Sequence, residues 1–304
     1  MTVVNNRSEL VFLYDIKDAN PNGDPLDANK PRIDEETGIN LVTDVRLKRT
    51  IRDYFFNYKG YNGKNDKDIF VREKENDDGT IQDGKTRAKD FEEAPEKVLK
   101  DCIDVRMFGG VIPLSGDSIT YTGPVQFQMG RSLHPVELKY IKGTGAFASG
   151  SGKSKKTFRE EHVVPYSLIG FYGIINENAA KETNLKEEDV DLLIEGMWRG
   201  TKNLITRTKV GQTPRLLLKV NYDEPNFFIG ELKNYINLET KKRKEEIRDV
   251  EDYHLDIIDL INVLDSNKDK IKNIEYLINP RIELFYEGEK TKLSDIEGFK
   301  KIEL

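Results

Sequence analysis

Continuous apolar runs along the chain predict buried strands. The runs are rich in β-branched and aromatic residues and are bounded by Gly, Pro, Asn or Asp, as is typical of core strands. The predicted strands are Ser8–Lys17, Ser118–Leu133 (broken at Gly123-Pro124), His162–Asn176 and Arg215–Tyr222, with a last strand over Arg281–Tyr286.

Apolar residues at helical spacing predict three helices. The first follows Thr43, a residue type that caps helices, and stops before Gly60. The second is expected to be capped by Thr183 or Asn184. In chain order, the apolar positions of the three helices are Leu47, Ile51, Tyr54, Phe55 and Tyr58; Val190, Leu193, Ile194, Met197 and Leu204; and Tyr253, Ile257, Leu260, Ile261 and Leu264.

The order of these elements predicts the fold class. Two segments interrupt it: Tyr61–Pro95 is polar, and we expect a mobile insertion without a core, while Gly143–Lys156 has the composition of a flexible loop. Without these insertions the chain reads β-α-β-β-α-β, the ferredoxin-like or RNA-recognition-motif arrangement of an α+β protein. Many unrelated functions share this fold, so the arrangement alone assigns no function.

Length and composition favour a globular cytoplasmic protein. The 304 residues are 37% hydrophobic, enough to bury a sizeable core in one large domain or two small ones. Cys102 is the one cysteine, so no intramolecular disulfide forms, which suits a reducing cytoplasm. We expect neither a signal peptide nor a transmembrane helix, because no apolar run reaches about 18 residues.

The net charge of −6 hides an uneven distribution. The stretches Lys139–Arg159 and Arg199–Lys219 are basic and contain no acid. Acids collect in three other stretches: Asp66–Asp104, Glu182–Glu195 and Glu245–Asp259. A chain that separates its charges in this way offers phosphates a basic track although it is acidic overall.

The loop Asp18–Asn29, DANPNGDPLDAN, resembles a calcium loop but lacks its setting. An EF-hand loop lies between two helices and ends in a bidentate Glu, whereas this loop follows a predicted strand and ends in Asn29. The histidines are scattered and give zinc no ligand spacing. We therefore expect no metal and no cofactor.

Aspartates in and around this loop raise the alternative of acid/base chemistry. Asp15, Asp18, Asp24 and Asp34 could supply paired carboxylates. Aspartates beside Gly and Pro, however, bond nearby backbone N–H groups and shape turns. We interpret these residues as turn formers.

The first predicted helix carries four cations within two turns: Arg46, Lys48, Arg49 and Arg52. They lie near the start of the helix, where the dipole is already positive, so they do not stabilise the helix itself. A phosphate backbone would gain both from these side chains and from the free N–H groups of the first turn. The alternative is an ordinary solvated helix face.

The sequence closely resembles one family over the run Tyr14–Tyr54, YDIKDANPNGDPLDANKPRIDEETGINLVTDVRLKRTIRDY. The family is the backbone subunit of type I CRISPR interference complexes (Cascade), the Cas-seven family of repeat-associated proteins, and the likeness is greatest to its subtype I-B branch. Further matching segments are DVRMFGG at Asp104–Gly110, TGPVQFQMGRSLHPV at Thr122–Val136 and EHVVPYSLIGFYGIIN at Glu161–Asn176.

The resemblance implies a single domain with a defined anatomy. An RNA-recognition-motif palm (7–58, 106–138 and 160–223) would carry a fingers insertion (60–105), a thumb loop (139–159) and a C-terminal extension (224–304). Several copies would polymerise along one CRISPR RNA and present it to target DNA, with other Cascade subunits as partners. A subunit that binds any spacer uses phosphates and shape, and we expect no catalysis. The sheet has a weak echo of the RNA-reading signature, at Ile169–Ile174, so base stacking on the sheet is not expected.

The resemblance also carries functional positions onto this chain. They fall on the helix at Thr43, on the loop before it, and on the thumb. The two basic runs add further positions, and the second run would contact RNA or target DNA. The expected RNA-binding residues are Asn22, Asp24, Lys30, Thr43, Arg46, Lys48, Arg49, Arg52, Lys142, Phe147, Lys153, Lys155, Lys156, Lys202, Arg207 and Lys209.

Two alternatives stay open at this point. Related subunits of type III complexes cut RNA with an aspartate in the loop after the first strand, so a metal-dependent ribonuclease that uses Asp24 or Asp34 is one. A stand-alone single-stranded nucleic-acid binder is the other.

Overall fold

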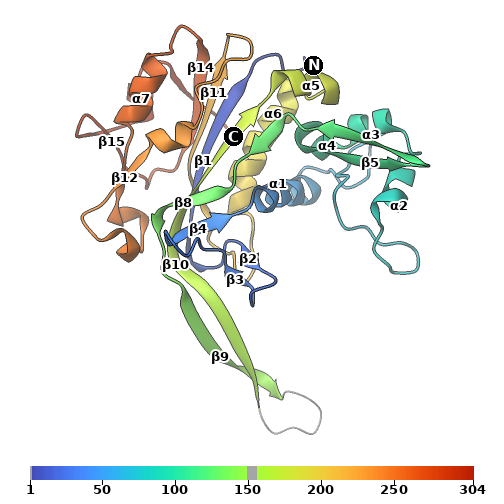
Figure 1. The fold of residues 1–304 in the computed structure, drawn as a ribbon, viewed down its shortest axis with the longest axis horizontal. Helices are drawn as coiled ribbons and strands as arrows, with labels where there is room; N and C mark the ends of the chain where they lie inside the picture. The colour runs from blue at the N-terminus through green and yellow to red at the C-terminus, as the bar shows by residue number, and fades with distance from the viewer. Residues whose placement is uncertain (1, 149–155) are drawn as a thin grey trace.

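A large mixed sheet forms the centre of the molecule. The computed structural model describes the backbone of residues 2–148 and 156–304 and the side chains of residues 2–144 and 160–304. The main sheet is nine-stranded, with the order β17-β14-β11-β1-β10-β8-β4, and β7 and β9 also pair with β10 (Figure 1). Its strands are β1 (Ser8–Ala19), β4 (Ile39–Val42), β7 (Val125–Phe127), β8 (Gly130–Pro135), β9 (Lys139–Ala148), β10 (Lys156–Ile175), β11 (Thr213–Tyr222), β14 (Ile271–Ile278) and β17 (Phe299–Lys301).

Strand β1 lies at the middle of this sheet, between β10 and β11, and pairs antiparallel with both. Its residues alternate between two hydrophobic clusters: Phe12 and Tyr14 point into one, Val11 and Leu13 into the other. The strand is thus apolar on both faces, which explains the continuous apolar run in its sequence. The predicted α+β class is confirmed.

Helices cover one face of the sheet. Helix α1 (Asp44–Tyr58) and helix α6 (Glu187–Glu195), which continues into a π-helical turn (Gly196–Gly200), pack their apolar sides on this face. A Cβ on Gly196 would lie 3.0 Å from Ile51 and Phe55, so the glycine lets the two helices approach closely. Helix α5 (Glu177–Thr183) precedes α6.

The C-terminal region covers the other face. Its buried residues join the second cluster together with Tyr166, Leu168 and Tyr172 of the sheet. Its elements are β12 (Asn237–Glu239), β13 (His254–Asp256), α7 (Ile258–Asp265), β15 (Leu284–Tyr286), β16 (Glu289–Thr291) and the 3₁₀ turns Leu232–Tyr235, Lys244–Glu246, Val250–Asp252 and Leu293–Asp295. The aromatic residues of this sheet face are therefore not accessible to bases.

A buried carboxylate fixes this covering to the sheet. Glu9, which is fully buried, accepts hydrogen bonds from the hydroxyls of Tyr172 and Tyr222 and from the backbone N–H groups of Ile229 and Gly230. Burial, strengthened by the nearby Glu9 carboxylate, raises the pKa of both tyrosines. Both hydroxyls therefore stay protonated and keep donating to Glu9.

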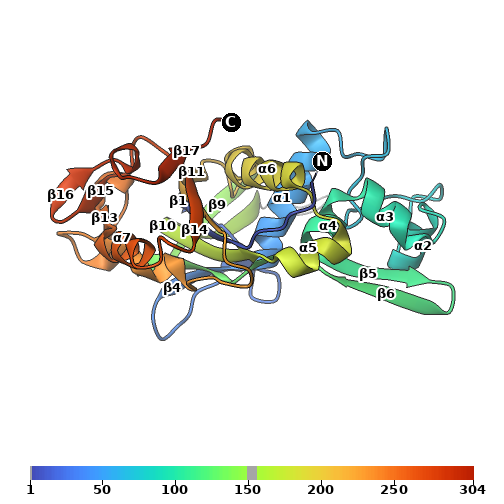
Figure 2. The same cartoon turned by 90° about the horizontal axis from the view of Figure 1, so that it is seen from above.

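Residues 60–122 build a separate small unit beside the helices. The prediction that the polar segment has no core is wrong: Phe70, Phe91, Val98 and Cys102 lie in a third buried cluster. Figure 2 shows this unit and the C-terminal region on opposite sides of the central sheet. Its elements are α2 (Gly84–Lys89), α3 (Pro95–Asp101), α4 (Ile103–Phe108) and the hairpin of β5 (Gly109–Leu114) and β6 (Asp117–Thr122).

Two further local predictions are corrected. The segment Ser118–Leu133 is divided among β6, β7 and β8, because β6 pairs with β5 and not with the main sheet. Asn184 does not cap the start of the second helix: it adopts a left-handed conformation (φ 58°) at the end of α5, a position that asparagine tolerates. Lys186 stands at the start of α6 instead.

The end of β10 that precedes Val164 leaves the sheet and forms a long ribbon with β9 (Figure 1). The pairing runs from Val163 opposite Lys139 to Lys156 opposite Ala148. The sequence predicted a flexible loop over 143–156. For residues 143–148 and 156 this prediction is wrong, because they belong to the paired strands β9 and β10, while residues 149–155 lie outside the described residues.

Candidate nucleic-acid interface

The loop after β1 is attached to the start of helix α1. Thr43 caps the helix as predicted, because its side-chain oxygen accepts the N–H of Arg46 at 3.2 Å. The Asn22 side-chain oxygen in turn accepts the backbone N–H of Thr43 at 2.9 Å and its hydroxyl at 3.0 Å. The loop and the first helical turn therefore form one fixed surface.

Within this loop, strands β2 (Gly23–Asp24) and β3 (Lys30–Pro31) form a miniature hairpin. Asp24 accepts the N–H of Leu26 at 3.0 Å and pairs with Arg32 at 2.8 Å. A Cβ on Gly23 would lie 2.1 Å from the Asn29 side chain, so glycine is required for the close approach. The carboxylate of Asp24 thus shapes the turn.

Asp34, Asp27 and Lys30 are also engaged in hydrogen bonds or ion pairs. Asp34 accepts the N–H of Glu36 at 3.2 Å and lies 3.7 Å from Arg131. Lys30 pairs with Asp27 at 2.8 Å. Among the residues that the structure describes, no group of His, Cys, Asp and Glu is arranged to hold a metal ion.

Arg46 and Lys209 are the cations that stand out electrostatically. Neither forms an ion pair with a carboxylate of residues 2–144 or 160–304, and the Arg46 Nε has no hydrogen-bond partner. Burial lowers the pKa of Arg46, and burial together with the positive charge of Arg46 lowers the pKa of Lys209. The charge of Asp53 acts on Arg46 in the opposite direction, but neither cation forms an ion pair with a described carboxylate. Two neighbouring, partly buried cations of this kind favour the binding of an anion.

The chain brings this pair together from distant segments. Arg46 lies on the first turn of α1, where its terminal nitrogen donates to Thr50 at 3.0 Å. Lys209 belongs to the segment before β11, which the loop holds through a hydrogen bond from the Asn20 N–H to the Thr208 carbonyl at 2.9 Å. The helix dipole adds to the positive potential at this place.

The other cations of α1 already have partners. Lys48 pairs with Asp44 at 3.0 Å and donates to Gln126 at 3.1 Å, and Arg49 pairs with Asp53 at 2.7 Å. Arg52 donates to Asp104 at 2.9 Å, with 11% of the Arg52 side chain and none of the Asp104 side chain exposed. Arg52 also lies over the ring of Phe108, at 5.1 Å from its centre.

The Asp104 carboxylate explains where Arg52 sits. It also accepts the backbone N–H groups of Phe70 at 2.8 Å and Val71 at 3.1 Å. Arg52 therefore ties helix α1 to the unit of residues 60–122. The charge of Arg52 is neutralised by Asp104 and stabilises the fold, so it is not free to bind a ligand.

The basic run Arg199–Lys219 likewise contains both exposed cations and cations that are buried in internal ion pairs. Lys202 is exposed, and Arg207 is exposed and lies 3.7 Å from Glu161 at the root of the ribbon. Arg215 and Lys219, by contrast, are buried in the sheet, paired with Asp15 at 2.7 Å and Glu275 at 3.1 Å. Strand β11 thus uses its cations for internal pairing.

The ribbon carries the remaining predicted residues. Lys142 lies 3.8 Å from Glu160 across the two strands. Lys153 and Lys155 lie outside the described residues, and so do the side chains of Phe147 and Lys156. Tyr140 and Ile141 of the ribbon are exposed.

Sequence reasoning missed Lys233. This lysine lies on the face of the sheet covered by the C-terminal region, and its stem is close enough to Gly170 that a Cβ there would meet it at 2.9 Å. Burial, followed by the charge of Arg131, lowers the pKa of Lys233. No motif could have found it, because its place depends on the tail folding back over the sheet.

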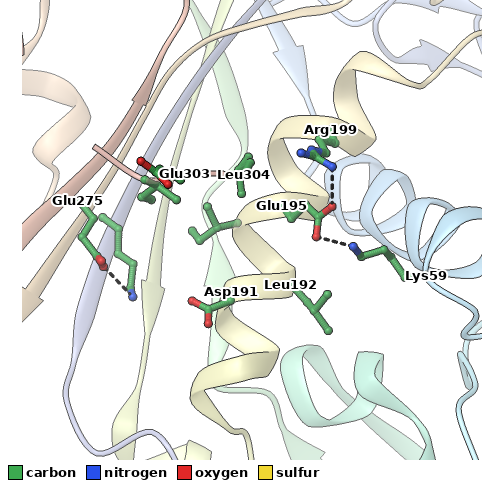
Figure 3. A pocket seen from close by; sticks show the side chains of 11 residues that line it. Lys59, Asp191, Leu192, Glu195, Arg199, Glu275, Glu303 and Leu304 are labelled. Atoms are coloured by element: carbon green, nitrogen blue, oxygen red, sulfur yellow. Dashed lines mark hydrogen bonds and ion pairs between the residues drawn. The ribbon is translucent and has the colours of Figure 1, made fainter. Parts of the chain in front are cut away.

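A cavity of about 530 Å³ lies at α6, away from this surface (Figure 3). Its three cations are paired: Glu195 accepts Lys59 at 2.7 Å and Arg199 at 3.3 Å, and Lys219 meets Glu275 across the sheet at 3.1 Å. Asp191 and Glu303 add further negative charge, so the cavity lacks the unpaired positive charge found at Arg46 and Lys209.

Comparison with known proteins identifies the family. Residues 6–258 match the model of the family CRISPR-associated protein Cas7. The chain belongs to this family. A relative from Haloferax volcanii, named CRISPR-associated protein Cas7, is 35% identical over 309 residues, which cover 92% of this chain and 88% of the relative.

Solved structures share the fold. One chain of a "CRISPR RNA-guided surveillance complex, pre-nicking" has a TM-score of 0.52 at 10% identity and covers 92% of this chain and 96% of its own length. One chain of a "CRISPR RNA-guided surveillance complex" has a TM-score of 0.53 at 11% identity and covers 90% and 88%. In the described part of this chain, no helix has the length and apolar character needed to cross a membrane.

Proposed function

We propose that this protein is a crRNA-binding backbone subunit that polymerises along a CRISPR RNA in a type I, I-B-like interference complex and presents the guide to target DNA. Membership of the Cas7 family supports this role. The observation that supports it in the structure is the pair Arg46 and Lys209, two neighbouring, partly buried cations that form no ion pair with a described carboxylate. Single-stranded RNA supplies a phosphate at this position and satisfies both.

The same proposal assigns the parts of the fold. Strands β11, β1, β10 and β8 with helices α1 and α6 follow the strand order and helix placement of an RNA-recognition-motif palm. We assign residues 7–58, 106–138 and 160–223 to this palm, 60–105 to the fingers, 139–159 to the thumb and 224–304 to an extension. The subunit works in the cytoplasm with copies of itself and with other Cascade subunits.

RNA binding at this surface is independent of sequence. The cations on and around α1 end in groups that bind phosphate, and the sheet face that would stack bases is covered by the C-terminal region. Lys48, Arg49, Lys202 and Arg207 add positive charge around Arg46 and Lys209. The remaining predicted contacts, from Asn22 to the thumb, line the path that the RNA follows.

A non-catalytic role agrees with the state of the loop aspartates. Asp24 and Asp34 are both occupied by turn N–H groups, and arginines lie beside both. A ribonuclease needs carboxylates that are free to bind a metal ion and substrate. We therefore assign these residues to the structure of the loop.

The proposal is tested by purifying the protein after co-expression with a CRISPR array and its processing enzyme. We expect oligomers with bound RNA and an absorbance ratio that shows nucleic acid. The variant Arg46→Gln/Lys209→Gln should lose this RNA, whereas Lys219→Gln, in which a paired lysine is removed, should keep it. A monomer free of RNA in the unsubstituted protein would show the proposal to be wrong.

A further inference from the structure

A hollow of about 500 Å³ lies between the second half of α1 and the segment 203–206, which follows α6 and its π-helical turn. Tyr54, Phe56 and Tyr58 of the helix line it, and so do Leu204 and Ile205 of the segment. Tyr58 is 58% exposed and Ile205 is 71% exposed, so the hollow has an open apolar wall. Pockets of this volume hold small organic ligands. We call this place the α1 pocket.

The rest of the lining of the α1 pocket is polar and has no net charge. Its charged residues, Arg49 and Asp53, are paired with each other at 2.7 Å. The other polar residues contribute amide and hydroxyl groups: Thr50, Asn57, Asn203 and Thr206. Aromatic and aliphatic side chains beside neutral amides suit a flat, uncharged ring with a polar edge, whereas a phosphate would find no unpaired cation inside the pocket.

Tyr58 is held in place as a platform for such a ring. Its own ring stacks on that of Tyr54, with the centres 5.3 Å apart and the planes at 29°. Tyr54 is fixed in turn, because its hydroxyl donates to Glu195 at 2.8 Å and a Cβ on Gly200 would lie 3.0 Å from its side chain. An exposed aromatic side chain that its neighbours hold in place loses little conformational entropy when a ligand stacks on it.

The α1 pocket adjoins the cation pair Arg46 and Lys209 on both of its walls. On the helix, Arg46 stands one turn before Thr50 on the same face and donates to its hydroxyl at 3.0 Å. On the opposite wall, the Lys209 N–H donates to the Thr206 carbonyl at 3.2 Å. Since Thr50 and Thr206 both line the pocket, each cation lies one hydrogen bond away from its edge.

We propose that the α1 pocket binds one nucleobase of the RNA strand whose phosphate lies at Arg46 and Lys209, an inference that rests on the proposed function. The base stacks on Tyr58, packs against Ile205 and turns its polar edge to Asn57. A base is linked covalently to its phosphate, so it reaches the neighbouring pocket without a further partner. Every base has a face that stacks on an aromatic ring, so binding stays independent of sequence.

A short RNA that holds one copy, with and without its bases, tests this inference. The probes are a labelled oligouridylate and an abasic oligomer of the same length, both titrated by fluorescence anisotropy. Tyr58→Ala should weaken binding of the oligouridylate at least about fivefold, because it removes a stacking contact, and should leave binding of the abasic oligomer unchanged. Tyr58→Phe keeps the ring and should bind both probes as the unsubstituted protein does.

Three further measurements separate stacking from other causes. Ile205→Ala should also weaken oligouridylate binding, whereas the matched control Val111→Ala should not, because Val111 is 54% exposed but lies on the β5–β6 hairpin outside the pocket. Stacking releases no counterions, so Tyr58→Ala should keep the salt dependence that Lys209→Gln reduces. Photo-crosslinking of the unsubstituted protein to an oligomer that contains 4-thiouridine should place the adduct within residues 53–58 or 203–206, a readout that needs no folded variant.

The outcomes distinguish this inference from the proposed function. If Tyr58→Ala weakens both probes equally, or if the adduct lies elsewhere, the pocket holds no base and the inference is wrong, while the RNA-binding role stands. If Tyr58→Ala leaves the short RNA unaffected but lowers the number of copies on a long RNA, the pocket holds a neighbouring copy and the inference is also wrong. If the unsubstituted protein binds neither probe, the proposed function fails and the inference fails with it.

Discussion

The two halves of helix α1 use the same residue type for different purposes. Arg46, on the first turn, is partly buried and forms no ion pair with a described carboxylate, although the charge of Asp53 acts on it, and its own charge lowers the pKa of Lys209. Arg52, less than two turns further on, is bound to the fully buried Asp104. Arg46 can therefore bind an external anion, whereas the charge of Arg52 is already neutralised by Asp104.

This contrast teaches how to interpret a basic helix. The cations of α1 form a uniform track in the sequence, but their partners differ. Lys48 and Arg49 pair within the helix, Arg52 pairs with Asp104 of the unit 60–122, and Arg46 forms no ion pair with a described carboxylate. A buried charge needs compensation, and the RNA phosphate proposed above would supply it at Arg46. The predictions below test this contrast from its largest expected effect to its smallest.

The largest effect is expected from Arg52→Ala. Removal of one partner leaves Asp104 charged and buried, which costs about 3–5 kcal/mol of the free energy of unfolding. Arg49→Ala is the matched control, because its pair with Asp53 is about half exposed and contributes about 0.3–0.5 kcal/mol. Urea unfolding measures both, and equal losses in the two variants would contradict the structural role of Arg52.

For RNA affinity, the largest loss is expected at Lys209, which has no carboxylate partner among the described residues, and none at Lys219, which is paired with Glu275. Lys209→Gln removes a charged hydrogen bond to phosphate, worth about 1.5–3 kcal/mol, which weakens affinity roughly tenfold or more. The salt dependence should fall by about one unit per lost phosphate contact, equally for every RNA sequence. Lys219→Gln should leave affinity unchanged, as titrations by fluorescence anisotropy will show. A loss that depends on the RNA sequence would argue against phosphate recognition.

A smaller effect is expected at the loop aspartate. Asp24→Asn weakens the partly exposed pair with Arg32, so the free energy of unfolding should fall by about 0.2–1 kcal/mol. Incubation with labelled RNA and magnesium should give no cleavage before or after the change. Cleavage by the unsubstituted protein that disappears in Asp24→Ala or Asp34→Ala would instead establish the ribonuclease alternative.

The smallest effect is a pair of opposite trends at alkaline pH. Burial lowers the pKa of Lys209 in the folded protein below the ordinary value, so above that lowered pKa the unfolded chain binds more protons than the folded one. Stability of the RNA-free protein should therefore rise slightly with pH in this window, while affinity for RNA falls as Lys209 loses its charge. Lys209→Arg, which keeps its charge, should flatten both trends in unfolding and binding measurements.

Much of this protein follows from its sequence alone. The apolar runs placed the core strands, Thr43 and Gly60 marked the ends of α1, and the blocks around NPNGDP and LVTDVRLKR indicated the family before any coordinates. These features are local: strand burial, helix caps and turn residues depend on neighbours in the chain. The loop Asp18–Asn29 was likewise correctly interpreted as a turn from its Pro and Gly spacing and its strand context.

The tertiary structure decided what local patterns do not encode. The polar unit of residues 60–122 acquired a core because Phe70, Phe91 and Val98, far apart in a charged sequence, meet in space. Arg52 became a structural cation because its partner Asp104 lies 52 positions away, whereas Arg46 forms no ion pair with a described carboxylate. Burial and pairing are properties of the packed chain, so neither can be predicted from neighbours in the sequence.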